Sequence, residues 1–594
     1  MKKLNVGLLL DGVYSDKYVH ELALWGKSQP DINISHLILH PCHENSLLAR
    51  LRDLIARRRL HLLPAKILFR LILAIEKALL RRIGVHKDHY KSCNLAEIFD
   101  QIVEITPIVS KSGHVYRFSD EDVEKIRALN LDLLIRCGSG ILRGEILGAS
   151  RLGIVSFHHG DNRAYRGGPA GFWECYHRSP RTGFIIQKLT EELDAGEVLV
   201  RGFFGTRYYY SLNQAHVYKK SLTHLKHLLK KVASTGSLPP SERAPAPYSN
   251  ILFRAPNLAQ CIVYGGKLMA RVFVKVVAGV LGFQEKWGIS ILSARWDQAV
   301  LWQSTAAAAP KGRFWADPFL RVRDGKTFCF VEDFAYKTGK AHITALEIRG
   351  TEIVEHGIAV NEPYHLSFPF LFEYRNQLYM CPEASASRQV RVYRCVEFPL
   401  KWELENILME GVSAADTMLF QKSGKWWLLT SIDESGAHDH CSELFLYSSD
   451  SPLSATWIPH PQNPIRIDSR GGRNAGLIVE GDKIFRLAQC QGFDRYGHSL
   501  LVHEIKEISE FCYVEEPVAT IGPGFRKGLR GTHHLSTSGN ITVIDHVTRS
   551  FAPGILFRAF KKIVLPRHDV GHASPVTASY TGEKRRQHIP HLGS

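Results

Sequence analysis

The stretch Gly-Ile-Val-Ser-Phe-His-His-Gly-Asp-Asn-Arg-Ala-Tyr-Arg-Gly-Gly-Pro, Gly153 to Pro169, is where the first half of the chain changes abruptly from apolar to titratable residues. An apolar run that ends at Val155 predicts a buried strand, and two glycines before Pro169 indicate a turn. In an open α/β sheet, ligands bind beyond the carboxyl ends of the strands. This stretch therefore predicts a site at the edge of a sheet.

The segments before this stretch alternate between strand and helix patterns. They predict a βαβ beginning of the Rossmann type, and Ser119 precedes a later helix as a candidate N-cap. The first turn lacks the Gly-x-Gly-x-x-Gly spacing, which argues against dinucleotide binding. The predicted strands are 5–10, 32–39, 115–118 and 132–136, and the predicted helices are 17–27, 120–128 and 141–147.

The length and composition indicate a two-domain globular protein. The chain has 594 residues, of which 45% are hydrophobic and 22% are charged. Its net charge of +17 fits a generally basic surface, and no basic-aromatic motif predicts specific nucleic-acid binding. The eleven cysteines form no Cys-x-x-Cys pair, so neither a metal site nor a disulfide framework is predicted. The N-terminus is interpreted as a strand rather than a signal peptide, and a cytoplasmic protein is expected.

A basic, leucine-rich segment from Leu47 to Arg82 interrupts the α/β pattern. Its apolar residues recur near helical spacing with cations between them, and Pro64 divides it into two predicted helices. One interpretation is an amphipathic helix on a membrane surface. The interpretation we favour is a helical insertion packed on its own domain, and peripheral membrane association remains the alternative.

Asp132 to Leu199 resembles the catalytic half of the formyltransferase family, which includes methionyl-tRNA, glycinamide ribonucleotide and sugar N-formyltransferases. The family pattern is a strand ending in Asn-x-His, then Arg-Gly, a helix with Pro and Trp, Thr-Gly and Asp-x-Gly. The matching residues here are Ser156-Phe157-His158, Arg166-Gly167, Pro169 with Trp173, Thr182-Gly183 and Asp194-Ala195-Gly196.

The resemblance implies formyl transfer to an amine through a tetrahedral oxyanion. His158 would stabilise the oxyanion and move a proton, Asp194 would set the ionisation of the histidine, and Ser156 stands where the family has asparagine. The implied donor is 10-formyltetrahydrofolate. Residues implied to bind this cofactor are Cys137, Gly138, Ser139, Ile141 and Leu142, and those expected beside the acceptor are His159, Asp161 and Arg166.

From about Trp302 the pattern changes to short aromatic and β-branched segments separated by turns. A loose repeat places a small polar cluster before an apolar strand. Its markers Asp317, Ser367, Asp416, Asn474 and Thr532 are separated by 50, 49, 58 and 58 residues. Five units of this length predict a five-bladed β-propeller.

This half resembles furanosidase-type five-bladed propellers and, more closely, the N-terminal propeller of plant glucosamine inositolphosphorylceramide transferases. The resemblance rests on Trp-Ala-Asp-Pro-Phe, His-Leu-Ser-Phe-Pro-Phe and Cys-Pro-Glu-Ala-Ser. Furanosidases place carboxylates at the inner strand ends, facing the central channel. The resemblance therefore implies a substrate-binding role for Asp317, Glu383 and Asp416.

Taken together, the sequence predicts a Rossmann-like formyltransferase domain followed by an all-β five-bladed propeller. The expected function is formylation of an amino sugar or glycan precursor, with the propeller recognising carbohydrate. The alternative is a carbohydrate-binding or glycosidase-like propeller with a degenerate formyltransferase-like domain. The sequence makes no prediction of oligomeric state. The expected divisions are 1–205 with an insertion at about 44–95, a connector 206–295, the propeller 296–565 and a disordered tail 566–594.

Overall fold

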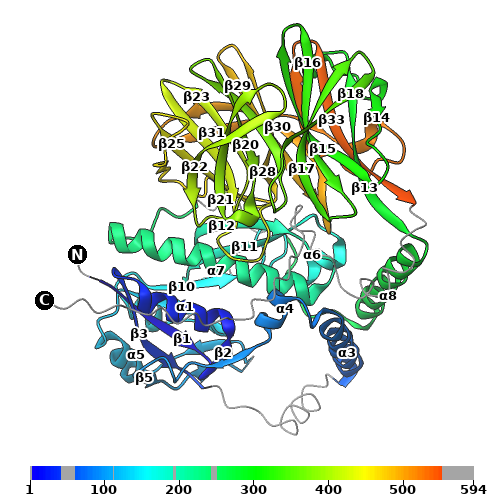
Figure 1. The fold of residues 1–594 in the computed structure, drawn as a ribbon. Helices are drawn as coiled ribbons and strands as arrows, with labels where there is room; N and C mark the ends of the chain where they lie inside the picture. The colour runs from blue at the N-terminus through cyan, green and yellow to red at the C-terminus, as the bar shows by residue number, and fades with distance from the viewer. Residues whose placement is uncertain (1–2, 42–59, 112, 192–195, 243–249, 552–594) are drawn as a thin grey trace, which may run out of the picture.

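A computed structural model of the protein describes residues 3–41, 60–111, 113–191, 196–242 and 250–551. It consists of an α/β part, formed by the first half of the chain, and a β-propeller formed by the second half (Figure 1). The two parts pack against each other along the long helix α7, Tyr210–Thr235.

The α/β part is built on a seven-stranded sheet in the order β12-β11-β10-β8-β1-β3-β5. The five strands from β10 to β5 are parallel, and β11 and β12 continue the sheet antiparallel. In chain order the parallel strands read 3-2-1-4-5, the order of a doubly wound sheet. The strands are β1 Leu4–Leu10, β3 Ile32–Leu39, β5 Gln101–Glu104, β8 Leu133–Arg136, β10 Ile154–His158, β11 Arg181–Lys188 and β12 Glu197–Gly205.

Side-chain caps fix the beginnings of two helices in this part. Asp16 accepts hydrogen bonds from the backbone of Tyr18 and Val19 at the start of α1, Lys17–Ser28. Ser119 caps α5, Asp120–Arg127, as its sequence position predicts. The predicted helix 141–147 does not form, because Ile141–Leu142 pairs as β9 and only a 3₁₀ turn follows, Glu145–Gly148.

The remaining elements of the first half surround this sheet. α3 begins with Pro64 in its first turn, where proline costs no hydrogen bond, and the part of the predicted insertion before residue 60 lies outside the described residues. These elements are β2 Tyr14–Asp16, α3 Leu63–Leu80, α4 Gly84–His89, β4 Ser92–Asn94, β6 Ile108–Val109, β7 Val115–Arg117, α6 Phe172–His177 and α8 Leu258–Val280.

The second half forms the predicted five-bladed propeller, with four sheets of four strands and one of five. Bulky apolar side chains pack between neighbouring blades and exclude water, as they do around Phe368, Trp427 and Leu446. The first four blades run β15 Arg313–Arg323, β16 Lys326–Ala335, β17 Lys340–Arg349, β18 Glu352–Val360; β19 Ser367–Tyr374, β20 Gln377–Glu383, β21 Gln389–Glu397, β22 Lys401–Glu410; β23 Ala414–Lys422, β24 Lys425–Ile432, β25 Glu443–Ser449, β26 Ile458–Pro459, β27 Arg466–Ile467; and β28 Arg470–Glu480, β29 Lys483–Gly492, β30 Arg495–Ile508, β31 Tyr513–Ile521.

The fifth blade joins strands from both ends of the second half, in the order β14-β13-β33-β32. β13, Phe283–Leu292, lies in the predicted connector but pairs along ten residues with β33, Ile541–Phe551. At the two ends of this sheet, β14, Thr305–Ala307, pairs with β13, and β32, Leu535–Ser538, pairs with β33. Because early and late strands share one sheet, the fifth blade fastens the two ends of the propeller together.

Buried ion pairs hold the two parts of the molecule together. Lys220 on α7 is fully buried, and its Nζ donates to Glu443 Oε2 at 2.7 Å and to the Asp439 backbone oxygen at 2.7 Å. His216 on the same helix lies 2.8 Å from Asp439 Oδ2. A buried cation with two carboxylates is costly to separate, so the propeller is firmly positioned against α7.

Candidate functional site

The carboxyl ends of the parallel strands hold a polar cluster, but its members bind one another. Arg136 Nη2 and His40 Nε2 each lie 3.2 Å from Asp11 Oδ1. Ser139 donates to Asp11 Oδ2 through its backbone nitrogen at 2.7 Å and through its hydroxyl at 2.5 Å. Burial and the nearby guanidinium of Arg136 lower the pKa of His40 to about 4, so the histidine is neutral. The cluster is therefore one carboxylate with its own donors.

This cluster and Tyr116 fill the space beside the loop predicted to bind the cofactor. A Cβ added at Gly138 would collide with Asp11 and Arg136, and one at Gly140 would collide with the ring of Tyr116. Ser139 donates its backbone N–H and its hydroxyl to Asp11, as described above. Cys137 packs against the main α/β core, Leu142 packs in a second buried cluster around Tyr116, and Ile141 pairs in β9. Four of the five residues predicted to bind a folate thus make contacts within the protein, and two of the five, Gly138 and Ser139, are also exposed to solvent.

Three residues predicted beside the reacting groups also have structural partners. Ser156 Oγ donates to the backbone oxygens of Arg136 and Phe157, at 3.4 and 3.3 Å. His159 stacks on Tyr218 with ring centroids 3.6 Å apart, and burial lowers its pKa well below the usual value. Asp161 Oδ1 pairs with Arg201 Nη1 at 2.6 Å.

The remaining predicted residues of this half are His158, Arg166 and Asp194. His158 ends β10, with its ring against Gly160, where an added Cβ would lie 3.2 Å from Nε2. The backbone oxygen of Arg166 accepts from Phe253 at 2.8 Å. Asp194, the predicted partner of His158, lies outside the described residues.

In the propeller, by contrast, the first strands of three blades carry the same backbone feature. β15, β19 and β23 each contain a two-residue bulge, and its first residue is Asp317, Phe368 or Asp416, with φ of 47°, 46° and 50°. A bulge with a left-handed residue redirects a side chain out of the strand's normal alternation. The structural repeat therefore places Phe368, one residue beyond Ser367, at the position equivalent to the two aspartates.

Asp416 and Glu383, two of the predicted carboxylates, share one buried arginine. Arg473 on β28 donates to Asp416 Oδ2 at 2.5 Å and Oδ1 at 3.1 Å, and to Glu383 Oε2 at 2.8 Å. Gln489 adds a hydrogen bond to Asp416 Oδ2 at 3.0 Å. Burial opposes the charge on Arg473, yet these carboxylates, Asp416 above all, raise its pKa well above the usual value. The network joins blades two, three and four.

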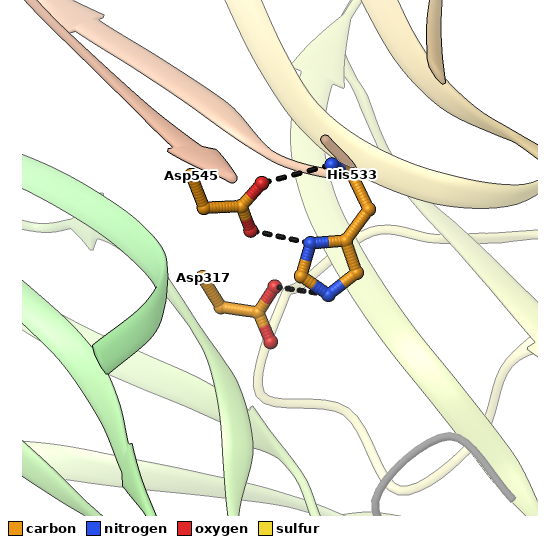
Figure 2. A group of neighbouring side chains, drawn as sticks. All are labelled: Asp317, His533 and Asp545. Carbon is orange, nitrogen blue, oxygen red and sulfur yellow. Dashed lines mark hydrogen bonds and ion pairs between the residues drawn. The ribbon is translucent and has the colours of Figure 1, made fainter. Parts of the chain in front are cut away.

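Asp317, the third predicted carboxylate, belongs to an Asp–His–Asp group that joins blades five and one (Figure 2). Asp545 on β33 contacts Nδ1 of His533 and accepts the His533 backbone N–H at 2.8 Å. On the other side of the ring, Nε2 lies 3.6 Å from Asp317 Oδ1. Although burial disfavours a charged imidazole, the two carboxylates raise the pKa of His533.

Acids outnumber cations at this centre among the described residues, and burial favours the protonated form of several of them. Burial, and then the charges of the neighbouring carboxylates, raise the pKa of Glu332 well above its usual value. Burial likewise raises the pKa of Glu383 well above its usual value and that of Asp317 to about 7. Asp545 differs, because His533 holds its pKa below the usual value despite burial. Neutral carboxyl groups in such a site donate hydrogen bonds as well as accept them.

Asp317, His533 and Asp545 are also a group whose ligand atoms lie within 4.8 Å of one another, as a metal site requires. The geometry fits hydrogen bonds better than metal coordination, because the two nitrogens of His533 face different carboxylates and Nδ1 is in direct contact with Asp545. A zinc ion about 2 Å from each ligand would hold the nitrogen and oxygen farther apart than a direct hydrogen bond. We interpret the group as an imidazolium between two acids.

Sequence reasoning selected three of these acids and missed four partners. The missed residues are buried charges inside apolar strands, or beside one, and that contrast is the signal that could have revealed them. Arg473 and His533 stand next to the repeat markers Asn474 and Thr532. Glu332 and Asp545 directly follow the strand-like runs Phe-Cys-Phe-Val and Ile-Thr-Val-Ile.

The comparisons with known proteins cover the same region. Residues 296–534 match the family model of glucosamine inositolphosphorylceramide transferase 1, N-terminal. The protein of that name from Oryza sativa subsp. japonica is 36% identical over 249 residues, which is 39% of this chain and 33% of the relative. The one from Arabidopsis thaliana is 34% identical over 221 residues, 36% of this chain and 28% of the relative. This chain thus spans about a third of the length of these transferases.

Solved structures give weaker likenesses to each part. A family 117 glycoside hydrolase from Zobellia galactanivorans, Zg3597, has a TM-score of 0.28 and 12% identity, and the match covers 45% of this chain and 91% of that one. Glycinamide ribonucleotide transformylase 1 from Symbiobacterium toebii has a TM-score of 0.25 and 13% identity, with 39% and 89% covered. At these scores neither likeness carries an argument.

The relatives overturn the predicted reaction. They are named as transferases of glucosamine inositolphosphorylceramide, so the prediction of formyl transfer from 10-formyltetrahydrofolate to an amine is wrong, and so is the folate cofactor. The physical reason is that a doubly wound sheet with a histidine at a strand end is shared by many chemistries. The predicted propeller and its resemblance to the N-terminal region of glucosamine inositolphosphorylceramide transferases are confirmed.

Proposed function

We propose that this chain serves glycosylation of an inositolphosphorylceramide-type sphingolipid, and that the propeller axis binds the sugar head group. One observation carries the proposal: the region similar to the named transferases, residues 296–534, contains Asp317, Glu332, Glu383, Asp416, Arg473 and His533. Four of the five axial acids, all except Asp545, therefore lie in the region that is similar to these proteins.

The chemistry of the cluster suits sugar hydroxyls. Carboxyl groups that are partly protonated accept from a hydroxyl and donate to it, whereas a fully ionised acid only accepts. Asp317 and Glu383 each keep 4% of their surface exposed, against 0% for Glu332 and Asp545. We therefore assign direct contact with the sugar to Asp317 and Glu383, and a supporting role to the two fully buried acids. With a pKa of about 7, Asp317 is also suited to exchange a proton with a hydroxyl near neutral pH.

Binding of the soluble head group tests this proposal without a membrane. Calorimetric titrations would compare inositol phosphate, glucosamine and glucosaminyl-inositol phosphate. We expect the last to bind and Asp317→Asn to weaken binding tenfold or more. Asp161→Asn is the matched control, because that aspartate pairs with Arg201 in the α/β part, away from the axis. If none of the three compounds binds, or if both variants bind as the wild type does, the proposal fails.

A further inference from the structure

Helix α8, Leu258–Val280, presents an apolar face that the described part of the protein does not cover. Its exposed residues are all apolar, and the large ones recur at helical spacing: Leu258 42%, Ile262 59%, Val263 45%, Met269 59%, Phe273 68%, Val274 50% and Val280 42% exposed. At 1.5 Å per residue, its 23 residues extend for about 34 Å. This surface is a continuous stripe rather than scattered apolar residues, and we call it the α8 stripe.

The three cations of α8 contact other residues of the protein. Lys267 Nζ donates to the Tyr176 backbone oxygen at 2.7 Å, and Arg271 Nη2 donates to Asp494 Oδ2 at 2.7 Å. Lys275 lies over the ring of Tyr209 at 5.7 Å. With its charged face fixed to the protein body, α8 keeps its apolar face outward. Among the described residues no helix has the length and apolar character needed to cross a bilayer.

Helix α3, Leu63–Leu80, lies beside α8 at one edge of the molecule and enlarges the stripe (Figure 1). The two helices meet where Gly265 faces Ile72, and Cys261 Sγ lies 3.7 Å from the Ala65 backbone oxygen. Residues three or four apart share a helix face, so exposed residues of both helices flank this line of contact. They are Ile262 and Met269 on α8 and Ile75 on α3, with Ile67 and Leu71 farther out on α3.

The exposed charges carried by α3, by the end of α3 and by α8 have one sign. The exposed cations of α3 lie between its apolar residues in the sequence and are Lys66, Arg70 and Lys77. Two more exposed cations, Arg81 and Arg82, follow the end of the helix. The sequences of α3 and α8 contain one acidic residue, Glu76, which is buried and accepts from the Tyr264 hydroxyl and, at 2.7 Å, from the Ser211 backbone. An apolar face with cations beside it and no exposed acid complements an anionic lipid surface.

We propose that the α8 stripe, together with the exposed face of α3, lies in the interface of an anionic membrane. The inference rests on the proposed function, because a protein that acts on a sphingolipid must reach it at a bilayer surface. α8 is followed directly by β13, the strand of the fifth blade that pairs with β33, which carries Asp545. Docking through α8 therefore sets the position of the propeller relative to the lipid.

Flotation with vesicles that contain no sphingolipid tests the docking by itself. The full chain would be mixed with vesicles of phosphatidylcholine with about 30% phosphatidylserine, and with vesicles of phosphatidylcholine alone. We expect flotation with the anionic vesicles at low salt, weakened by high salt because screening acts on the cations. Met269→Glu with Phe273→Glu should reduce binding tenfold or more, because both side chains then face the bilayer as anions.

The matched control places the same change on exposed apolar residues elsewhere. Val518→Glu with Phe511→Glu alters side chains that are 51% and 77% exposed on the fourth blade, and it should float as the wild type does. Thermal unfolding followed by circular dichroism must match the wild type in both double variants, which shows that they fold. Wild-type protein that stays at the bottom, or an α8 variant that floats normally, overturns the docking proposal.

Two further outcomes separate this inference from its rivals. If the wild type is a dimer that the α8 variant converts to a monomer, and neither floats, the stripe is an interface between copies and the proposal is wrong. If the wild type floats while no head group binds in solution, membrane docking holds and the proposed function fails.

Discussion

The polar cluster at the edge of the α/β sheet and the acid cluster on the propeller axis differ in how their charges are balanced. At the sheet edge one carboxylate, Asp11, meets one guanidinium, Arg136, and a histidine that burial keeps neutral. In the described part of the chain, the five buried acids on the axis have Arg473 and His533 as their cations. A balanced cluster is satisfied by its own members and is typical of structure. An acid excess that the fold retains despite its cost is typical of a site.

The largest expected difference between the two regions comes from deleting one arginine in each. Arg473→Leu leaves Asp416 and Glu383 buried without their shared cation, and we expect a loss of about 3 to 5 kcal/mol in the free energy of unfolding. Arg163→Leu breaks an exposed pair with Glu242 beside the sheet edge and should cost less than about 1 kcal/mol. Urea denaturation of both variants measures the free energy of unfolding. Equal losses in the two variants would show that the axial arginine is no more important for stability than the exposed one.

A smaller expected effect is the pH dependence of stability caused by the buried carboxyl group of Glu332 on the propeller axis. Because the pKa of Glu332 is raised in the folded state, the folded protein binds more protons than the unfolded chain above about pH 4.5, and this residue lowers stability as pH rises. Glu332→Gln mimics the protonated acid. We expect its stability relative to the wild type to increase from pH 5 to pH 8.

Chemical denaturation of both proteins across that pH range gives the difference directly. Glu242→Gln serves as the control in the α/β part, where the side chain is partly exposed and solvent screens its contacts with Arg163 and Arg201. It should show no such trend. A Glu332→Gln variant that loses stability relative to the wild type as pH rises would show that the glutamate is ionised and held by cations.

The smallest expected effect is at the sheet edge itself. His159 was predicted to bind substrate, but its neutral ring stacks between Phe157 and Tyr218. His159→Phe keeps an aromatic ring in that stack, and we expect a stability change below about 1.5 kcal/mol and unchanged head-group binding. Thermal unfolding and the titration described above measure both quantities. Loss of head-group binding in this variant would show that the sheet edge takes part in substrate binding.

The site was predicted unevenly for a physical reason. The repeat spacing identified Asp317 and Asp416, because each propeller blade must bring its first strand to the axis with the same backbone feature. In the α/β part, resemblance at His158 and Asp194 suggested a reaction that the relatives contradict. Nothing in the local sequence shows that Asp11 and Tyr116 fill the space beside the Cys137–Leu142 loop, because these residues are far away along the chain.

By itself the sequence determined the alternation of strands and helices, the change to all-β structure near Trp302, and the propeller repeat. These features depend on periodicity and turn residues, which act over short distances along the chain. Only the tertiary structure decided that β13 closes the fifth blade, that Arg473 and His533 hold the axial acids, and that α8 turns its apolar face outward. Each of these depends on contacts between residues distant in sequence, and so on how the whole chain packs.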